Sequence, residues 1–121
     1  MAEARNHLSL SEVEVLVGNI TRWERIDEPY LGRRQGYKGS IGDVVIEVSH
    51  RKEVGVQGRS LCIEVFSGDP KQLLATYSKY KEFMINGSRE ERKLDELYFQ
   101  AEEAYRAQEN ASKVRELVRS L

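Results

Sequence analysis

Carboxylates are the first candidates for chemistry in this sequence. Asp43, Glu47 and Glu64 lie in or beside two segments rich in β-branched residues, a composition typical of β-strands. Carboxylates on adjacent strands can hold a divalent metal ion, and metal-dependent nucleases add a lysine two residues after one of them. No lysine follows Glu47 or Glu64 at that spacing. Charged residues on a solvated sheet face are therefore the favoured interpretation, and a small metal-dependent nuclease is an alternative.

Residues 31–60 form a locally basic segment. Tyr37 and His50 lie among its cations, and a surface that combines cationic and aromatic groups can hold phosphates and stack bases. Nucleic-acid binding through this segment is thus an alternative function. The excess of cations over carboxylates is small, and no RNP, KH or zinc-finger pattern is present, which favours ordinary solvated loops. The candidate polyanion-binding residues are Arg33, Arg34, Lys38, Arg51, Lys52 and Arg59.

Other reactive residues are few and scattered. His7, His50 and Cys62 show no paired spacing that could form a zinc site. Cys62 is the only cysteine, so no disulfide can form within the chain, and its apolar surroundings are typical of a buried small hydrophobe. Residues 36–40 resemble a phosphate loop in composition but lack the P-loop spacing and a following helix. The sequence therefore predicts no catalytic residue, no metal and no cofactor.

Length and charge limit the remaining possibilities. The chain has 121 residues, which suits one domain with one core. The formal net charge is −1, so the molecule as a whole is not drawn to nucleic acid or to anionic membranes. No secretion signal and no apolar run of membrane-spanning length is present. We expect a single cytoplasmic domain over residues 1–121, with residues 1–7 unstructured.

Three segments are predicted as strands. Residues 42–49 and 60–66 alternate apolar and polar side chains and are bounded by glycine, which indicates a hairpin with its apolar rows on one face. Residues 20–26 are a third strand by their β-branched and aromatic content. Residues 27–36 are predicted as a connection, and residues 37–40 as an extension of the strand that follows. The expected sheet is a three-stranded antiparallel meander.

The helices are predicted from caps and spacing. Residues 9–17 fit either a strand or a short helix, and the Ser9 to Glu12 capping box favours the helix. Residues 70–86 have apolar residues at helical spacing after a potential N-cap at Asp69. A further capping box opens a long helix over residues 88–121. The expected fold is α+β, with a short N-terminal helix, the meander and then an αα-hairpin.

The last predicted helix is too long for the domain. Its roughly 33 residues would measure about 50 Å, whereas a compact domain of this size is about 35 Å across. Either the helix breaks near Asn110 and folds back, or its end packs against another copy, and we favour the second. Fraying of the last turns is the simplest alternative. One apolar stripe is expected to run along the helix to Val114, Leu117, Val118 and Leu121.

The expected function follows from this helix. Phe99 lies off the main stripe and is predicted to be an exposed contact residue. We therefore expect a non-enzymatic protein-interaction module that forms a homodimer through its C-terminal helix, with a possible protein partner for the other sheet face or the basic loops.

Overall fold

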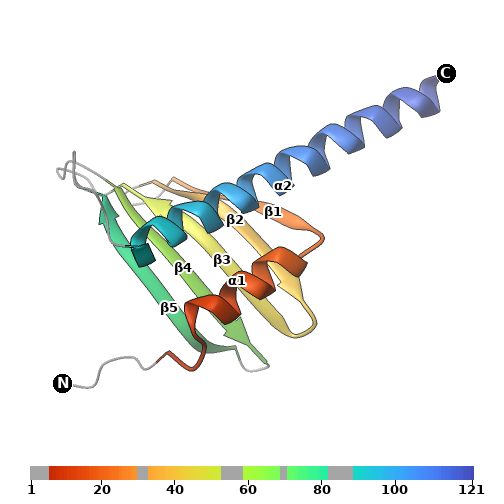
Figure 1. Cartoon of the computed structure of the whole chain (residues 1–121). Helices are drawn as coiled ribbons and strands as arrows, with labels where there is room; N and C mark the ends of the chain where they lie inside the picture. Colours follow the sequence, from red (N-terminus) through yellow and green to blue (C-terminus); the bar gives the residue numbers. More distant parts are fainter. Residues whose placement is uncertain (1–5, 30–32, 53–58, 69–70, 82–88) are drawn as a thin grey trace.

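Two helices and five strands make up the part of the chain that the structure describes. The computed structural model describes residues 6–29, 33–52, 59–68, 71–81 and 89–121. The strands pair antiparallel in chain order, and both helices lie on the same face of the sheet (Figure 1). The elements are α1 (Leu10–Asn19), β1 (Trp23–Glu28), β2 (Arg34–Ile41), β3 (Val44–Arg51), β4 (Arg59–Ser67), β5 (Gln72–Lys81) and α2 (Arg89–Ser120).

The sheet has five strands where the sequence predicts three, although the α+β class is confirmed. Residues 37–40 belong to a separate strand, β2, and do not extend β3. Ile41 pairs with Val44 across a two-residue turn, and Gly42 in that turn has a φ of 58°. A two-residue hairpin requires such a left-handed conformation, which glycine adopts at little cost. The chain therefore reverses direction at Gly42, whereas the sequence interpretation has one strand continuing through this position.

The αα-hairpin prediction is wrong because residues 72–81 form β5, which pairs with β4 along its whole length. The proposed N-cap Asp69 and the end of the expected helix at residues 82–88 lie outside the described residues.

A break in the β4–β5 register explains why the sequence of β5 is interpreted as a helix. Val65 pairs with Ala75 but Phe66 pairs with Leu73, so Leu74 is an additional residue in β5. A bulge of this kind interrupts the alternation of inward and outward side chains. Leu74 and Tyr77 both pack against the core and are three residues apart, a spacing that is also found along one face of a helix.

Helix α1 is confirmed, together with its cap. The backbone N–H of Glu12 donates to the Ser9 hydroxyl at 3.2 Å, and the N–H of Ser9 donates to the Glu12 carboxylate at 2.9 Å. These two bonds form the expected capping box, and they lower the pKa of the Glu12 carboxyl. Val13 and Val17 are buried against the sheet.

The first residues before α1 are also held in place. Asn6 and His7, which the sequence predicts to be unstructured, contact β5. The His7 N–H donates to the carbonyl of Leu74 at 2.8 Å, and the side-chain oxygen of Asn6 accepts from the N–H of Thr76 at 2.8 Å.

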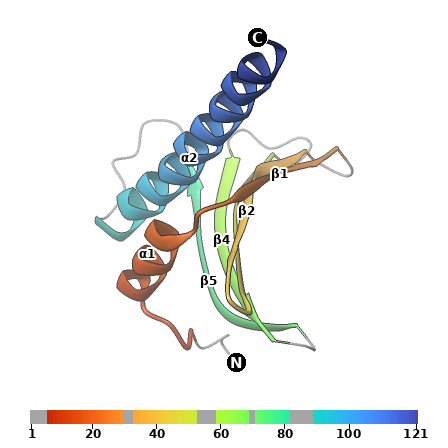
Figure 2. The same ribbon diagram turned by 90° about the vertical axis from the view of Figure 1, so that its right-hand side faces the viewer.

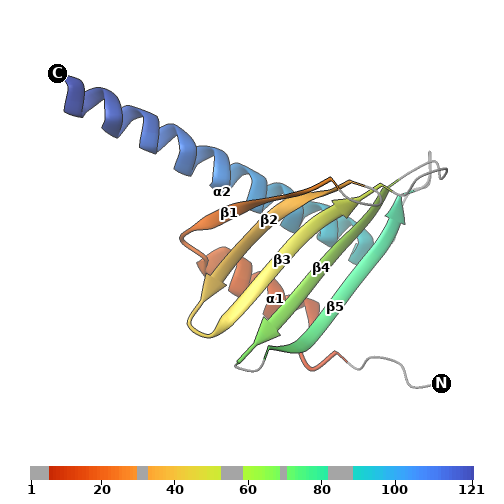
Figure 3. The same ribbon diagram turned by 180° about the vertical axis from the view of Figure 1, so that it is seen from behind.

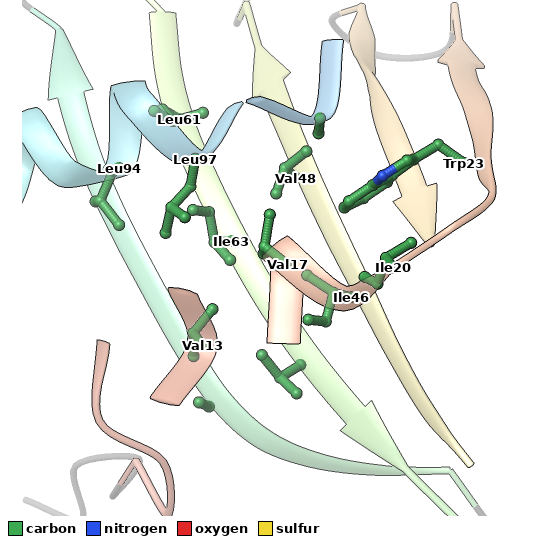
Figure 4. Packing of buried hydrophobic residues seen from close by; sticks show 13 residues of the cluster. Val13, Val17, Ile20, Trp23, Ile46, Val48, Leu61, Ile63, Leu94 and Leu97 are labelled. Atoms are coloured by element: carbon green, nitrogen blue, oxygen red, sulfur yellow. The ribbon is translucent and has the colours of Figure 1, made fainter. Parts of the chain in front are cut away.

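The core lies between the helices and the sheet (Figure 4). Gly39 of β2 leaves the space that the largest core side chain fills. A Cβ at Gly39 would lie 2.5 Å from Ile20 and 2.9 Å from Trp23, so only glycine fits there. The buried core residues are Val13, Val17, Ile20, Trp23, Ile46, Val48, Leu61, Ile63, Val65, Ala75, Leu94, Leu97 and Ala101.

Helix α2 is continuous from Arg89 to Ser120, so no break occurs near Asn110. Its first half crosses the sheet and buries Leu94, Leu97 and Ala101, while its end runs past β1 into solvent (Figure 2). Lys79 of β5, whose side chain is largely buried, forms an ion pair with Asp95 of α2. In the described ranges, neither helix is long and apolar enough to cross a membrane.

Candidate functional site

Residues 107–121, here named the C-terminal segment of α2, begin at the edge strand β1, which Gln108 contacts, and the rest of α2 extends beyond the sheet (Figure 1). All residues from 112 to 121 are exposed. Four of them are large and apolar, and their exposed fractions are 59% for Val114, 60% for Leu117, 63% for Val118 and 96% for Leu121. Together with Phe99, these are the residues that the sequence predicts for self-association. Four such side chains within eight residues form an apolar patch that the protein's own core does not cover.

The exposed apolar residues point away from the sheet. An α-helix turns by about 100° per residue, so Leu117 lies about 160° and Leu121 about 200° around the axis from the buried Ala101. The sequence predicts one continuous stripe on one face, but the apolar residues turn around α2 away from the sheet: Val118 lies about 100° and Val114 about 140° around the axis from Ala101.

The exposed residues repeat every seven positions. Ala107, Val114 and Leu121 are seven residues apart, and so are Asn110 and Leu117. A seven-residue apolar repeat is the pattern by which two helices pair in a coiled coil. We name these residues the outer seam, together with the pair Ala111 and Val118: Ala107, Asn110, Ala111, Val114, Leu117, Val118 and Leu121.

Phe99 extends this face toward the globular part. It is 56% exposed, and it precedes Leu117 by 18 residues, or about five helical turns, so the two side chains point in the same direction. Apolar spacing in the sequence predicts an exposed Phe99, and helical geometry now places it in line with the outer seam. Glu103 lies between them on the same face, so the apolar surface is interrupted there.

The second candidate surface is the open face of the sheet, which neither helix covers (Figure 3). Its central cation is Arg34, whose side chain is only 15% exposed. The guanidinium lies 2.6 Å from Glu28, 2.7 Å from Glu47 and 4.0 Å from Glu64. Lys71 adds a second cation 3.4 Å from Glu47. The cations and carboxylates at the centre of this face thus compensate one another.

The environment of Glu47 shows the strength of this compensation. Burial alone would raise the pKa of the Glu47 carboxyl, but the hydrogen bond and charge of Arg34, with a smaller contribution from Lys71, outweigh it. The pKa is therefore lowered, and the carboxylate is charged at neutral pH. Glu47 and Glu64 lie on adjacent strands, as the sequence predicts, and the register of β3 and β4 places them opposite each other, but Arg34 contacts both. The described residues contain no group of His, Cys, Asp or Glu side chains placed to hold a metal.

The predicted polyanion-binding residues do not gather into one free cationic patch. Three of them contact carboxylates: Arg34 as above, Arg33 at 3.8 Å from Asp27, and Lys38 at 3.7 Å from Glu24. Arg51 and Lys52 are exposed at the end of β3, and the side chain of Arg59 lies outside the described part of the chain. Nucleic-acid binding stays a prediction that this geometry does not favour.

A hollow of about 410 Å³ opens on the same face, between the β2–β3 turn and the start of β5. The Lys71 ammonium lies 3.9 Å from the ring centroid of Phe66, on the wall of the hollow. Sequence reasoning missed this hollow because it treats Lys71 as part of a helix. Arg22, Lys38, Glu24, Asp43 and Glu47 also line it, so both charge signs are present.

Cys62 has no surroundings that would make it a nucleophile. Its thiol is half-buried and lies 3.8 Å from the Thr76 hydroxyl. Burial raises the pKa of the Cys62 thiol, so the reactive thiolate is disfavoured at neutral pH.

No protein-family model, curated protein or solved structure matches the chain.

Proposed function

We propose that the protein is a non-enzymatic interaction module that self-associates through the C-terminal segment of α2. One observation carries the proposal: Val114, Leu117, Val118 and Leu121 are exposed, and all four lie about 100° or more around the axis of α2 from the buried Ala101. In this structure none of the described residues covers them. A second copy presents the same apolar residues and can cover them through a two-fold axis.

The available apolar area supports a reversible dimer. Fully burying a Val or Leu side chain contributes about 1.5–3 kcal/mol. Four such side chains from each copy exceed the lower estimates of the cost of association, which run from roughly 4 to 15 kcal/mol. Because the segment is short, we expect a dissociation constant of roughly 1–100 μM.

Such a dimer leaves the open faces of both sheets uncovered. The open face lies on the side of the sheet away from α2, so pairing through the outer seam does not obstruct it (Figure 3). We propose that this face, with the hollow beside Phe66 and Lys71, is the surface that each copy offers to a protein partner. Its mixed charges and the partly exposed ring of Phe66 fit a polar protein surface better than a polyanion.

Sedimentation equilibrium of the full chain over a concentration series tests self-association. We expect a monomer–dimer equilibrium for the parent and a monomer for Leu117→Lys. The matched control is Ser112→Lys, which adds the same charge to an exposed position about 140° away on the same helix. This control should dimerise like the parent. A parent that remains monomeric at about 500 μM, far above the expected dissociation constant, with full helical circular dichroism, would overturn the proposal.

A further inference from the structure

We infer that two copies pair with their α2 helices antiparallel, centred on Val114. This inference rests on the proposed self-association and specifies its geometry. The outer seam is asymmetric along its length, since its first half contains the small residues Ala107 and Ala111 and its second half contains Leu117 and Leu121. The direction of pairing decides which of these sizes meet.

An antiparallel pair places small residues against large ones. With Val114 opposite Val114 of the other copy, Leu121 lies opposite the other copy's Ala107. In the same register, Leu117 lies opposite the other copy's Ala111, and Val118 lies opposite Asn110. Each leucine then faces an alanine, and the central layer contains two valines, so the layers have similar volumes. Layers of similar volume allow the two helix axes to keep a constant separation, as close packing requires.

A parallel pair would match each residue with itself. Two Ala107 side chains would share one layer, and two Leu117 or two Leu121 side chains would share others. Because the axial separation of packed helices depends on the side chains between them, the small layers would be left underpacked. The composition of the outer seam thus favours the antiparallel direction. The helix macrodipoles also oppose each other favourably in that direction.

The antiparallel pair has a defined shape. Its overlap, residues 107–121, is about 21 Å long. The buried contacts of α2 with its sheet are centred near residue 98, which is about 24 Å along the axis from Val114. The two sheets are then about 48 Å apart along the paired helices. Because the outer seam faces away from each sheet, the two open faces point in opposite directions. The dimer is therefore a bivalent molecule that can bridge two identical partners.

Single cysteines at three positions test the direction of pairing. All are introduced into a Cys62→Ser background, so that the native thiol cannot contribute. Disulfides require Cα atoms about 4.4–6.8 Å apart. Val114→Cys lies at the centre of the pair in either direction and reports pairing itself. In the antiparallel pair, the two copies of residue 121 are about 21 Å apart, so Leu121→Cys alone cannot link.

The expected pattern under a glutathione redox buffer is specific. Val114→Cys chains link to each other, and Ala107→Cys chains mixed with Leu121→Cys chains give the mixed disulfide. Leu121→Cys chains alone remain unlinked. Linking of Leu121→Cys to itself without the mixed product would overturn the antiparallel inference and leave self-association intact. Linking at Val114→Cys alone would overturn the register. Absence of all three links, together with a monomeric parent in sedimentation, would overturn the proposed function as well.

Discussion

The side-chain amide of Gln108 pairs with the backbone of Trp23 at the free edge of β1. Its nitrogen donates to the Trp23 carbonyl at 2.8 Å, and its oxygen accepts from the Trp23 N–H at 2.9 Å. The amide thus satisfies the two backbone groups that a sixth strand would otherwise bond. Because this contact joins α2 to the outermost strand, it fixes the direction in which the C-terminal segment leaves the sheet.

We expect Gln108→Ala to lower the free energy of unfolding by about 1–2 kcal/mol, because both backbone groups of a buried residue lose their partner. Trp23 is the only tryptophan and is buried, so its fluorescence reports unfolding in urea and local solvent access in the native state. A red-shifted native spectrum should accompany the lost stability.

Gln100→Ala is the matched control, since Gln100 is an exposed glutamine on the same helix. This variant should unfold like the parent to within about 0.5 kcal/mol. Equal effects of the two substitutions would show that the bonds to Trp23 contribute nothing specific.

Gly39 gives a second stability expectation. A Cβ at this position would lie 2.5 Å from Ile20 and 2.9 Å from Trp23. Gly39→Ala should therefore destabilise the fold by about 1–3 kcal/mol through overpacking. Gly18→Ala should do the opposite: it lies in α1, its Cβ would meet Gln100 at an ordinary 3.7 Å, and alanine favours the helix by up to about 1 kcal/mol. Urea unfolding measures the change in the free energy of unfolding for both variants. A Gly39→Ala variant as stable as the parent would contradict the close packing of Ile20 and Trp23 on Gly39.

The core strands could be predicted from the sequence, and the sheet's full extent could not. Ile46, Val48, Leu61, Ile63 and Val65 are buried as their alternation indicates. The missing strands have weaker local signals: β2 contains two glycines that pack against neighbouring atoms, and β5 contains a bulge. Their strand conformation depends on pairing with β3 and β4, and such tertiary contacts override local propensity.

The candidate surface was predictable in part. The length of the last helix and the apolar character of its end identify Val114, Leu117, Val118 and Leu121 from the sequence alone. Counting about 100° per residue separates them from Ala101, but only the sheet's position shows that their face points outward. Glu28 and Glu47 neutralise Arg34 only because the pairing of β1, β2 and β3 brings these three side chains together. Counting charges along the sequence could not predict this contact.

Acid should weaken the fold through Glu47. Its pKa is lowered in the folded state, so the ionised carboxylate adds stability above its ordinary pKa of 4.5, and this contribution is lost as the pH falls below that value. Glu47→Gln should cost about 1–3 kcal/mol at pH 7, because Arg34 loses its closest buried partner.

Urea unfolding as a function of pH measures this difference. The difference in free energy of unfolding between the parent and Glu47→Gln should shrink as the pH falls below about 4.5. Glu116→Gln, at an exposed site on α2, is the control and should follow the parent throughout. If this stability difference stays constant from neutral to acid pH, the charge of Glu47 does not cause it.

Oligonucleotide binding is expected to be weak. Arg33, Arg34 and Lys38 are engaged by carboxylates, so a phosphate must compete with those contacts. Fluorescence anisotropy with labelled single- and double-stranded oligonucleotides should show little binding, and Arg51→Ala should change it little. Tight binding that falls steeply with salt and is lost in Arg51→Ala would instead support the nucleic-acid alternative.

Lys113 offers an independent test of the direction of pairing. It flanks the outer seam, and a two-fold axis perpendicular to antiparallel helices brings both copies of Lys113 to the same side, about 3 Å apart along the axis. A parallel pair would put them on opposite sides. The antiparallel pair therefore contains a charge repulsion that salt screens, so added salt should tighten the dimer.

Mixing parent chains with Lys113→Glu chains measures the same contact. In the antiparallel pair, the mixed dimer replaces repulsion between like charges by attraction, so it should exceed its statistical share, by about twofold to fivefold for an exposed pair. Arg119→Glu is the control, because Arg119 is exposed about 140° around the helix from Val114 and its two copies would be about 15 Å apart along the axis, so it should mix statistically with the parent. Native mass spectrometry of the mixtures measures the relative amounts of the two homodimers and the mixed dimer. Statistical mixing with Lys113→Glu would indicate that the two lysines are apart, as the parallel direction requires.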